Sequence, residues 1–216
     1  MPKLVPSILE NAKDQFLDKE SRETKLPGVE RIQVDFGDGV FVPNKILPVT
    51  EIDTLNPAFH WEAHLMIKEP EDFLDYQICG FKTIIIHYEA YPSETKLHSA
   101  LQNIKSMGFE PVICLKADTE IAVLKDFSGE VKHFQLMGVE PGFQGSPFIE
   151  QTVDRIKELR ELIPNAIIEI DGGINETNIK KVADAGADLI VLGSAITKVS
   201  DMLAAWEKLN SVLSAG

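Results

Sequence analysis

Short apolar segments recur along the chain, and each is followed by a longer stretch with a polar or helical pattern. Apolar runs of this length favour buried strands. There are eight of them: Leu4 to Leu9, Arg31 to Phe36, Trp61 to Met66, Thr83 to Tyr88, Pro111 to Leu115, His133 to Val139, Ile167 to Asp171 and Leu189 to Leu192. Their spacing is roughly 22 to 33 residues, which is about one strand plus one crossover helix. The pattern therefore predicts repeated β/α units.

The segment from 149 to 163 shows the helical part of the pattern. Its apolar residues recur near the 3.6-residue helical period, at Val153, Ile156, Leu159 and Ile163. Strands that are apolar on both faces, with helices between them, fit an α/β (β/α)8 barrel, or TIM barrel, better than an open doubly wound sheet. Periodicity does not report closure, so the open sheet remains an alternative. No linker or shift in composition interrupts residues 1–216, and we expect one domain.

The composition indicates a soluble globular protein and excludes some classes. Hydrophobic residues make up 44% and charged residues 25% of the 216 residues, and no apolar run approaches the length of a membrane span. The first residues enter a strand-like segment without a signal-peptide pattern, so we expect a cytoplasmic protein. Cys79 and Cys114 lie beside Ile78 and Ile113, which favours small buried hydrophobic residues in a reducing compartment.

The net charge of -13 argues against nucleic-acid binding, which needs a basic surface. An anionic substrate would be repelled at long range by such a surface. Its site would then need local positive potential from backbone N–H groups, helix N-termini or a metal.

Polar side chains gather at the C-terminal ends of the predicted strands, where barrels of this kind carry their active sites. Side chains alternate along a strand, so Gln33 shares a face with Asp35, and His64 with Met66. Asp171 ends the seventh apolar segment and, taken alone, fits a solvated turn residue equally well. Two carboxylates, an imidazole and a carboxamide can therefore converge on one cavity.

Asp35, His64 and Asp171 are candidate ligands for a divalent cation, because carboxylates and imidazole are common metal donors. Carboxylates can also move protons at a carbon next to a carbonyl while a cation stabilises the enediolate. An isolated His64 would more often be a structural core histidine, but its expected convergence with two carboxylates favours function. For His87 and Glu89 we keep the structural interpretation.

Glycine-bearing loops follow the last three predicted strands. Gly142 and Gly145 follow the sixth, Gly173 the seventh, and Gly193 with Ser194 the eighth. A phosphate site built from the last two strand-end loops and a short helix N-terminus recurs on this fold. Glycine turns are common, and only their position in the strand order favours phosphate binding.

Six segments in order resemble the ribulose-phosphate 3-epimerase family, over nearly the whole chain. They are Pro6-Ser7-Ile8-Leu9; Val34-Asp35 with Asp38-Gly39 and Phe41-Val42-Pro43-Asn44; His64-Leu65-Met66; Val139-Glu140-Pro141-Gly142-Phe143; Ile170-Asp171-Gly172-Gly173; and Gly193-Ser194-Ala195-Ile196. The resemblance implies a (β/α)8 barrel that interconverts D-ribulose 5-phosphate and D-xylulose 5-phosphate by inverting C3. Family members are commonly dimers or hexamers, so it also implies a homo-oligomer.

The resemblance also implies roles for individual residues. Asp35 and Asp171 would be the acid/base pair on opposite faces of the substrate, and with His64 they would bind the metal. The implied substrate contacts also include Ser7, His64 and Gly142, with Met66 and Met137 beside the enediolate. Gly145, Gly173, Gly193 and Ser194 would hold the phosphate. From the residues alone, the two methionines would more often belong to the core.

The chain departs from the family pattern at several positions. Gln33 stands where the family usually has a histidine ligand. A carboxamide is a poorer metal ligand than an imidazole, so the affinity for zinc should fall. Manganese, magnesium, iron or no metal then become stronger candidates. Gly37 replaces a usual methionine, Gln144 and Ser146 alter the loop after the sixth strand, and residues 45–48 depart from the usual continuation. Gln33 is therefore a doubtful ligand.

Two other functions remain open at this point. One is a 3-epimerase for a hexulose 6-phosphate such as allulose 6-phosphate. The other is a sugar-phosphate-binding barrel that has lost catalysis through Gln33. A decarboxylase or aldolase is disfavoured, because those sites resemble an Asp-x-Lys-x-x-Asp pattern and Asp35 is followed by Phe36-Gly37-Asp38.

Overall fold

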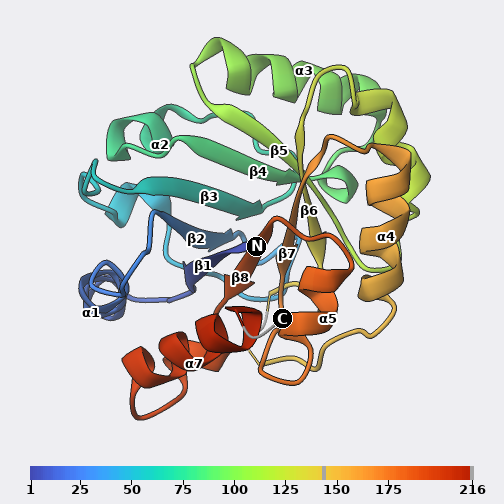
Figure 1. Cartoon of the computed structure of the whole chain (residues 1–216). Helices are drawn as coiled ribbons and strands as arrows, with labels where there is room; N and C mark the ends of the chain where they lie inside the picture. The colour runs from blue at the N-terminus through green and yellow to red at the C-terminus, as the bar shows by residue number, and fades with distance from the viewer. Residues whose placement is uncertain (143–144, 215–216) are drawn as a thin grey trace. The chain divides into compact units, whose positions relative to one another are not determined.

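The computed structural model describes residues 1–142 and 145–214, in which parallel strands alternate with helices (Figure 1). The strands are β1 (Lys3–Ile8), β2 (Arg31–Gly37), β3 (His60–Met66), β4 (Thr83–His87), β5 (Glu110–Leu115), β6 (His133–Met137), β7 (Ile167–Asp171) and β8 (Leu189–Leu192). They are joined in the order β1 to β8 as a closed barrel. The predicted (β/α)8 topology is confirmed, and the open sheet is wrong.

Helices lie between most consecutive strands, and the last two helices follow the last strand. They are α1 (Lys13–Glu23), α2 (Leu74–Cys79), α3 (Glu94–Ser106), α4 (Thr152–Leu162), α5 (Ile179–Asp184), α6 (Ser194–Thr197) and α7 (Met202–Ser214), with short 3-10 helices η1 (Val49–Glu51), η2 (Tyr88–Ala90) and η3 (Ile121–Phe127). In the predicted helix from 149 to 163, now α4, Ile156 and Leu159 are fully buried. Within the described ranges, no helix has the length and hydropathy to cross a membrane.

Contacts between residues divide the chain into two compact units, residues 7–114 and residues 1–6 with 115–216. In the first unit, β2 pairs with β3 and β3 with β4, all parallel, with Asp35 opposite His64. In the second, β6 pairs with β7 and β7 with β8, with Met137 opposite Asp171. That residues 1–216 fold as one domain stays a prediction.

Alternation along β2 explains how the strand serves both the core and the site. Ile32, Val34 and Phe36 are all buried on one face. Phe36 packs edge-on against Tyr76 of α2, with ring centroids 5.1 Å apart, and against Phe81, at 5.7 Å. Such aromatic pairs contribute about 0.5–1.5 kcal/mol each beyond their buried area. The residues between these positions therefore point to the opposite face, toward the barrel interior.

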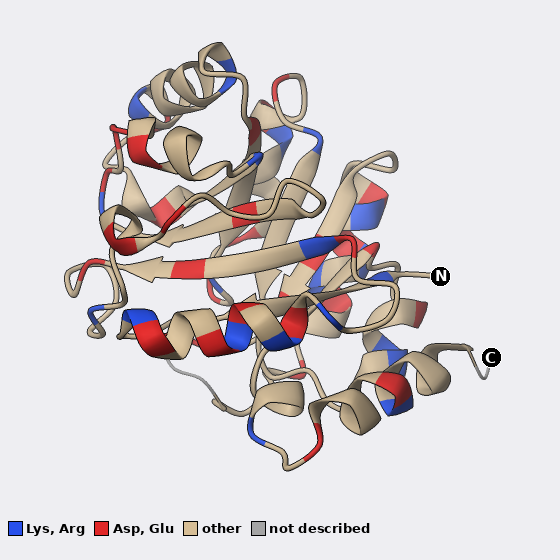
Figure 2. Ribbon diagram, turned by 90° about the vertical axis from the view of Figure 1, so that its left-hand side faces the viewer, with Lys and Arg blue, Asp and Glu red and all other residues tan. Residues whose placement is uncertain are grey.

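Helix α1 carries alternating charges along its exposed face (Figure 2). Its buried residues are Phe16 and, at the last position, Glu23. Neither carboxyl oxygen of Glu23 has a hydrogen-bond partner among the described residues. Burial raises the pKa of Glu23 to about 8. The final turn of α1 therefore places an acid out of contact with water.

Candidate active site

The carboxyl ends of β2 and β3 bring three predicted site residues together. His64 Nδ1 lies 2.9 Å from Asp35 Oδ1, and Gln33 Nε2 donates a hydrogen bond to the same oxygen at 2.8 Å. Gln33 and His64 are fully buried, and Asp35 is 6% exposed. Ser7 of β1 is also buried and lies opposite Gln33 in the parallel register. The side chains of Gln33, Asp35 and His64 therefore converge, as expected from the strand pattern.

The amide of Gln33 presents its N–H2 group to the other two side chains. Besides the bond to Asp35, Gln33 Nε2 lies 3.3 Å from His64 Nδ1. A metal ligand must offer a lone pair, and the nitrogen of a carboxamide offers only donor hydrogens. In this orientation Gln33 holds the Asp35 carboxylate in place and does not present a ligand atom on that side.

Asp38 organises the loop that follows β2. Its Oδ1 accepts hydrogen bonds from the backbone N–H groups of Val40 and Phe41, each at 2.8 Å, and its Oδ2 accepts one from Lys68 at 2.8 Å. Burial by itself would raise the pKa of Asp38, but the backbone hydrogen bonds outweigh it, so the pKa is lowered. Asp38 therefore joins the loops after β2 and β3 as a structural anion.

The end of β2 has no room for a side chain at Gly37. A Cβ atom there would lie 2.9 Å from Asn44 O, 3.0 Å from Ile46 Cδ1 and 3.1 Å from Val42 Cγ2. Val42 and Ile46 form one buried apolar cluster with Met66. The departures at Gly37 and at residues 45–48 are therefore coupled through packing. Met66 contacts this cluster, so its predicted contact with a substrate stays a prediction.

Two residues given a structural interpretation from the sequence extend this group. His87, the last residue of β4, places Nε2 at 2.9 Å from His64 Nε2, and the two rings stack with centroids 5.0 Å apart. His87 Nδ1 lies 3.6 Å from Glu89 Oε2. The sequence already places His87 at the end of the strand that follows the one carrying His64. An isolated histidine is more often structural, so that position alone did not indicate a functional role.

In the second unit, β6 and β7 end together. Asp171, the last residue of β7, lies opposite Met137 in the register, and its backbone oxygen accepts a hydrogen bond from Gly138 N at 2.6 Å. Asp171 is partly exposed, whereas Met137 is buried. Asp171 therefore ends the strand at a position where its carboxylate can meet a solute.

The two glycines after Asp171 are required by close packing. Both have positive φ, 107° at Gly172 and 71° at Gly173. A Cβ atom at Gly172 would lie 2.4 Å from Val139 Cγ2, and one at Gly173 would lie 2.8 Å from Phe148 Cα. Only glycine fits both conditions. The backbone after β7 is thus packed directly against Val139 and Phe148.

A cation that the sequence analysis missed lies beside one predicted phosphate glycine. A Cβ atom built on Gly145, whose φ is 85°, would lie 3.2 Å from Lys198 Nζ. Lys198 follows α6 directly, and α6 begins at Ser194, after Gly193. No strand or helix period points to Lys198, because its proximity depends on the reach of a long side chain. It adds the local positive charge that an anionic substrate needs.

The loop after β6 is described only in part. Gly142 has a φ of 103°, in the left-handed region that favours glycine. Phe143 of the family-like segment and Gln144, one of the departures, lie outside the described residues. The predicted contact of Gly142 with the substrate therefore stays a prediction.

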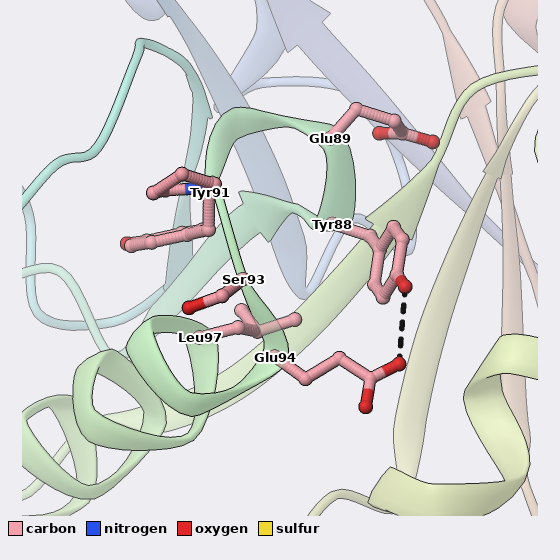
Figure 3. A pocket seen from close by; sticks show the side chains of 7 residues that line it. Tyr88, Glu89, Tyr91, Ser93, Glu94 and Leu97 are labelled. Atoms are coloured by element: carbon pink, nitrogen blue, oxygen red, sulfur yellow. Dashed lines mark hydrogen bonds between the residues drawn. The ribbon is translucent and has the colours of Figure 1, made fainter.

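A pocket of about 240 Å³ lies where β4 leads into α3, beside Glu89 (Figure 3). Its lining residues are Tyr88, Glu89, Tyr91, Pro92, Ser93, Glu94 and Leu97. Tyr88 donates a hydrogen bond from its hydroxyl to Glu94 Oε1 at 3.2 Å. Two carboxylates and, among the residues that the structure describes, no cation line this pocket, so its charge does not suit a sugar phosphate.

Residues 3–197 match the model of the ribulose-phosphate 3 epimerase family. The chain belongs to this family. The predicted resemblance is therefore confirmed, and it covers both compact units of the chain.

The chain is 34% identical to the ribulose-phosphate 3-epimerase of Aquifex aeolicus, over 99% of this chain and 97% of that protein. It is 35% identical to the chloroplastic ribulose-5-phosphate-3-epimerase of Arabidopsis thaliana, over 91% of this chain and 72% of that protein. Among solved structures, the 3-hexulose-6-phosphate synthase of Salmonella typhimurium superposes with a TM-score of 0.69 at 17% identity, over 99% of this chain and 99% of that one. This last likeness supports the fold alone.

Proposed function

We propose that this protein is a ribulose-phosphate 3-epimerase that interconverts D-ribulose 5-phosphate and D-xylulose 5-phosphate. The observation that carries the proposal is the buried Asp35 carboxylate, held by Gln33 and His64 at the end of β2 in a chain of this family. The name of each curated relative cited above supports the same substrate. A carboxylate held in this way is oriented to take a proton from a carbon acid.

In the proposed mechanism, Asp35 and Asp171 act on opposite faces of C3. One carboxylate removes the C3 proton, and the carbonyl at C2 becomes an enediolate. The other residue, which starts as a carboxylic acid, returns a proton to the opposite face of C3. The configuration at C3 is therefore inverted, and the number of protons is conserved. Support comes from the strand topology, because both residues stand near the carboxyl ends of parallel strands, where (β/α)8 barrels carry catalytic groups.

A divalent cation, when bound, would stabilise the negative charge of the enediolate. Asp35, His64 and Asp171 are the residues we propose to hold it. The carboxylate and imidazole of the first two, 2.9 Å apart, fit a shared ion. Gln33 would need its amide reversed to become a ligand, and it otherwise keeps Asp35 oriented. A set rich in oxygen donors suits manganese, magnesium or iron as well as zinc.

We propose that the phosphate binds at the ends of β7 and β8. Backbone N–H groups near Gly173, Gly193 and Ser194 would donate to its oxygens. Lys198, next to Gly145, would add a full positive charge in a chain with a net charge of -13. Ser7, Met66, Met137 and Gly142 complete the proposed substrate contacts. The homo-oligomer and the cytoplasmic location stay predictions.

Exchange in D2O tests the proposal directly. Purified protein incubated with D-ribulose 5-phosphate should introduce deuterium at C3 and form D-xylulose 5-phosphate, as followed by NMR. The Asp35→Asn and Asp171→Asn variants should each lose exchange, while Asp154→Asn, an exposed carboxylate on α4, should keep it. Absence of exchange by the parent protein, with and without added Mn²⁺, Zn²⁺ or Fe²⁺, contradicts the proposal. Faster turnover of allulose 6-phosphate in the same assay would assign the hexulose substrate instead.

A further inference from the structure

Three fully buried side chains with soft or borderline donor atoms meet at the ends of β3, β4 and β5. They are His64, His87 and Cys114, each 0% exposed. One ring nitrogen of each histidine and the cysteine sulfur all lie within 4.8 Å of one another. His87 and Cys114 lie opposite each other in the parallel register. We propose that these three residues form a binding site for a zinc-class divalent cation.

The positions of the ring protons of His64 follow from its neighbours. His64 Nδ1 and Asp35 Oδ1 lie 2.9 Å apart, and two lone pairs at this distance would repel. His64 Nδ1 therefore carries a proton and donates a hydrogen bond to Asp35 Oδ1. A neutral imidazole has only one N–H, and the other nitrogen keeps its lone pair. His64 Nε2 therefore presents a lone pair to His87.

The surroundings of His87 favour the same tautomer. Its Nδ1 lies 3.6 Å from Glu89 Oε2, too far for a strong hydrogen bond but close enough for the carboxylate to attract an N–H on that side. His87 Nε2 can then also present a lone pair. The two Nε2 atoms face each other at 2.9 Å, a distance that fits either one N–H donated from ring to ring or a cation bound by both lone pairs.

The third donor favours a bound cation over a hydrogen bond between the two rings. A hydrogen bond would satisfy the two imidazoles without any role for the Cys114 sulfur. A thiolate with two imidazoles is instead a ligand set for zinc or another borderline-soft ion, whereas magnesium and calcium prefer oxygen. Tetrahedral zinc would separate the two nitrogens slightly from their present 2.9 Å, a change that small rotations of the rings supply.

The groups behind the two rings match those around zinc-bound histidines. Such a histidine almost always donates its second N–H to a carboxylate, a carbonyl or water, which fixes its tautomer. Asp35 stands behind His64 and Glu89 behind His87. The ring of Phe41 also contacts His87, with centroids 4.8 Å apart, which limits its rotation. Both imidazoles are therefore held with Nε2 toward the common point.

This site differs from the metal position in the proposed epimerase mechanism. There, Asp35 and His64 Nδ1 would hold the ion, whereas the new site uses His64 Nε2 and leaves the Nδ1–H group donating to Asp35. A filled site would thus keep His64 as a hydrogen-bond donor to Asp35. Both sites use His64, so an ion in the new site would keep Nδ1 from serving the epimerase site, and the new site is tested by its sulfur ligand and not by C3 exchange.

Cobalt(II) titration of the metal-free full-length protein tests the site, because a Co²⁺–thiolate bond gives a near-ultraviolet charge-transfer band. The parent protein should develop this band with a stoichiometry of about one ion per chain, and Zn²⁺ should abolish it. Cys114→Ser should lose the band, and His87→Asn should weaken binding at least tenfold. Cys79→Ser is the matched control, since Cys79 is the other buried free cysteine and should leave the band unchanged. Circular dichroism checks that each variant is folded.

X-ray absorption of the zinc-loaded parent protein identifies the atoms bound to zinc without the use of a variant. It should show one sulfur neighbour at about 2.3 Å and nitrogen neighbours at about 2.0–2.1 Å. A nitrogen and oxygen shell without sulfur would overturn the proposal, as would a charge-transfer band that survives in Cys114→Ser or disappears in Cys79→Ser. Failure of the parent protein to bind Co²⁺ would overturn it as well and would assign the contact between the rings to a shared proton.

Discussion

Replacing Glu23 by glutamine should stabilise the protein, and the gain should grow with pH. The Glu23 carboxyl is fully buried and has no hydrogen-bond partner among the described residues. Its pKa is raised to about 8, first by burial and then by the negative charges of Asp35 and Glu10, while Lys19 and Arg22 act in the opposite direction. Glutamine keeps the shape of the side chain and removes the ionisable group.

The sign and size follow from the two pKa values of Glu23, 4.5 as the ordinary value and about 8 in the folded protein. Below pH 4.5 the group is protonated in both states and has no effect on unfolding. Between the two values only the unfolded state ionises, so stability falls by about 1.4 kcal/mol per pH unit. The loss is on the order of 3 kcal/mol at pH 7 and approaches roughly 5 kcal/mol above pH 9, as an upper estimate.

Urea denaturation at pH 5, 7 and 9 measures this effect. Glu23→Gln and the parent protein should differ little at pH 5, and the variant should be more stable by a margin that rises through pH 7 to pH 9. Glu158→Gln, an exposed acid on α4, is the control and should give a difference that does not change with pH. A constant difference for Glu23→Gln between pH 5 and pH 9 would refute the buried, protonated state of Glu23.

Three further predictions concern the site. Asp35→Asn should lower C3 exchange by roughly 10²–10⁴-fold while the variant keeps its parent circular dichroism spectrum. Lys198→Ala should raise KM for the sugar phosphate by roughly tenfold or more with a smaller change in kcat, as steady-state kinetics would measure, whereas Lys180→Ala on α5 should not. Gly37→Met should destabilise the fold by about 1–3 kcal/mol in urea denaturation, and adding Ile46→Ala should recover part of the loss.

The fold was predictable because it depends on periodic features that a single sequence displays. Alternation along β2 places Val34 and Phe36 in the core and Gln33 and Asp35 on the opposite face. The same reasoning joins Asp35 to His64 once the two strands are taken as neighbours. Parallel pairing in register then brings the two side chains within 2.9 Å, a distance that no pattern in the sequence contains.

The finer chemistry of the site depends on orientation, which periodicity does not carry. The sequence identifies Gln33 as a replacement for a histidine, but only the hydrogen-bond network shows that its amide nitrogen, and not its oxygen, faces Asp35. His87 and Glu89 were assigned a structural role because each was judged alone. In the structure, His87 Nε2 lies 2.9 Å from His64 Nε2, a contact between side chains of neighbouring strands, and Glu89 Oε2 lies 3.6 Å from His87 Nδ1.

The departures from the family pattern also change meaning when their packing is known. From the sequence, Gly37 and residues 45–48 are two separate losses of similarity. In the structure, Ile46 and Val42 fill the space that a side chain at position 37 would occupy, beside Met66. The end of β2 thus keeps an apolar wall, supplied from the following loop instead of from the strand. Restoring methionine at position 37 alone would therefore test overpacking, and adding Ile46→Ala would test whether Ile46 occupies the space that the methionine needs.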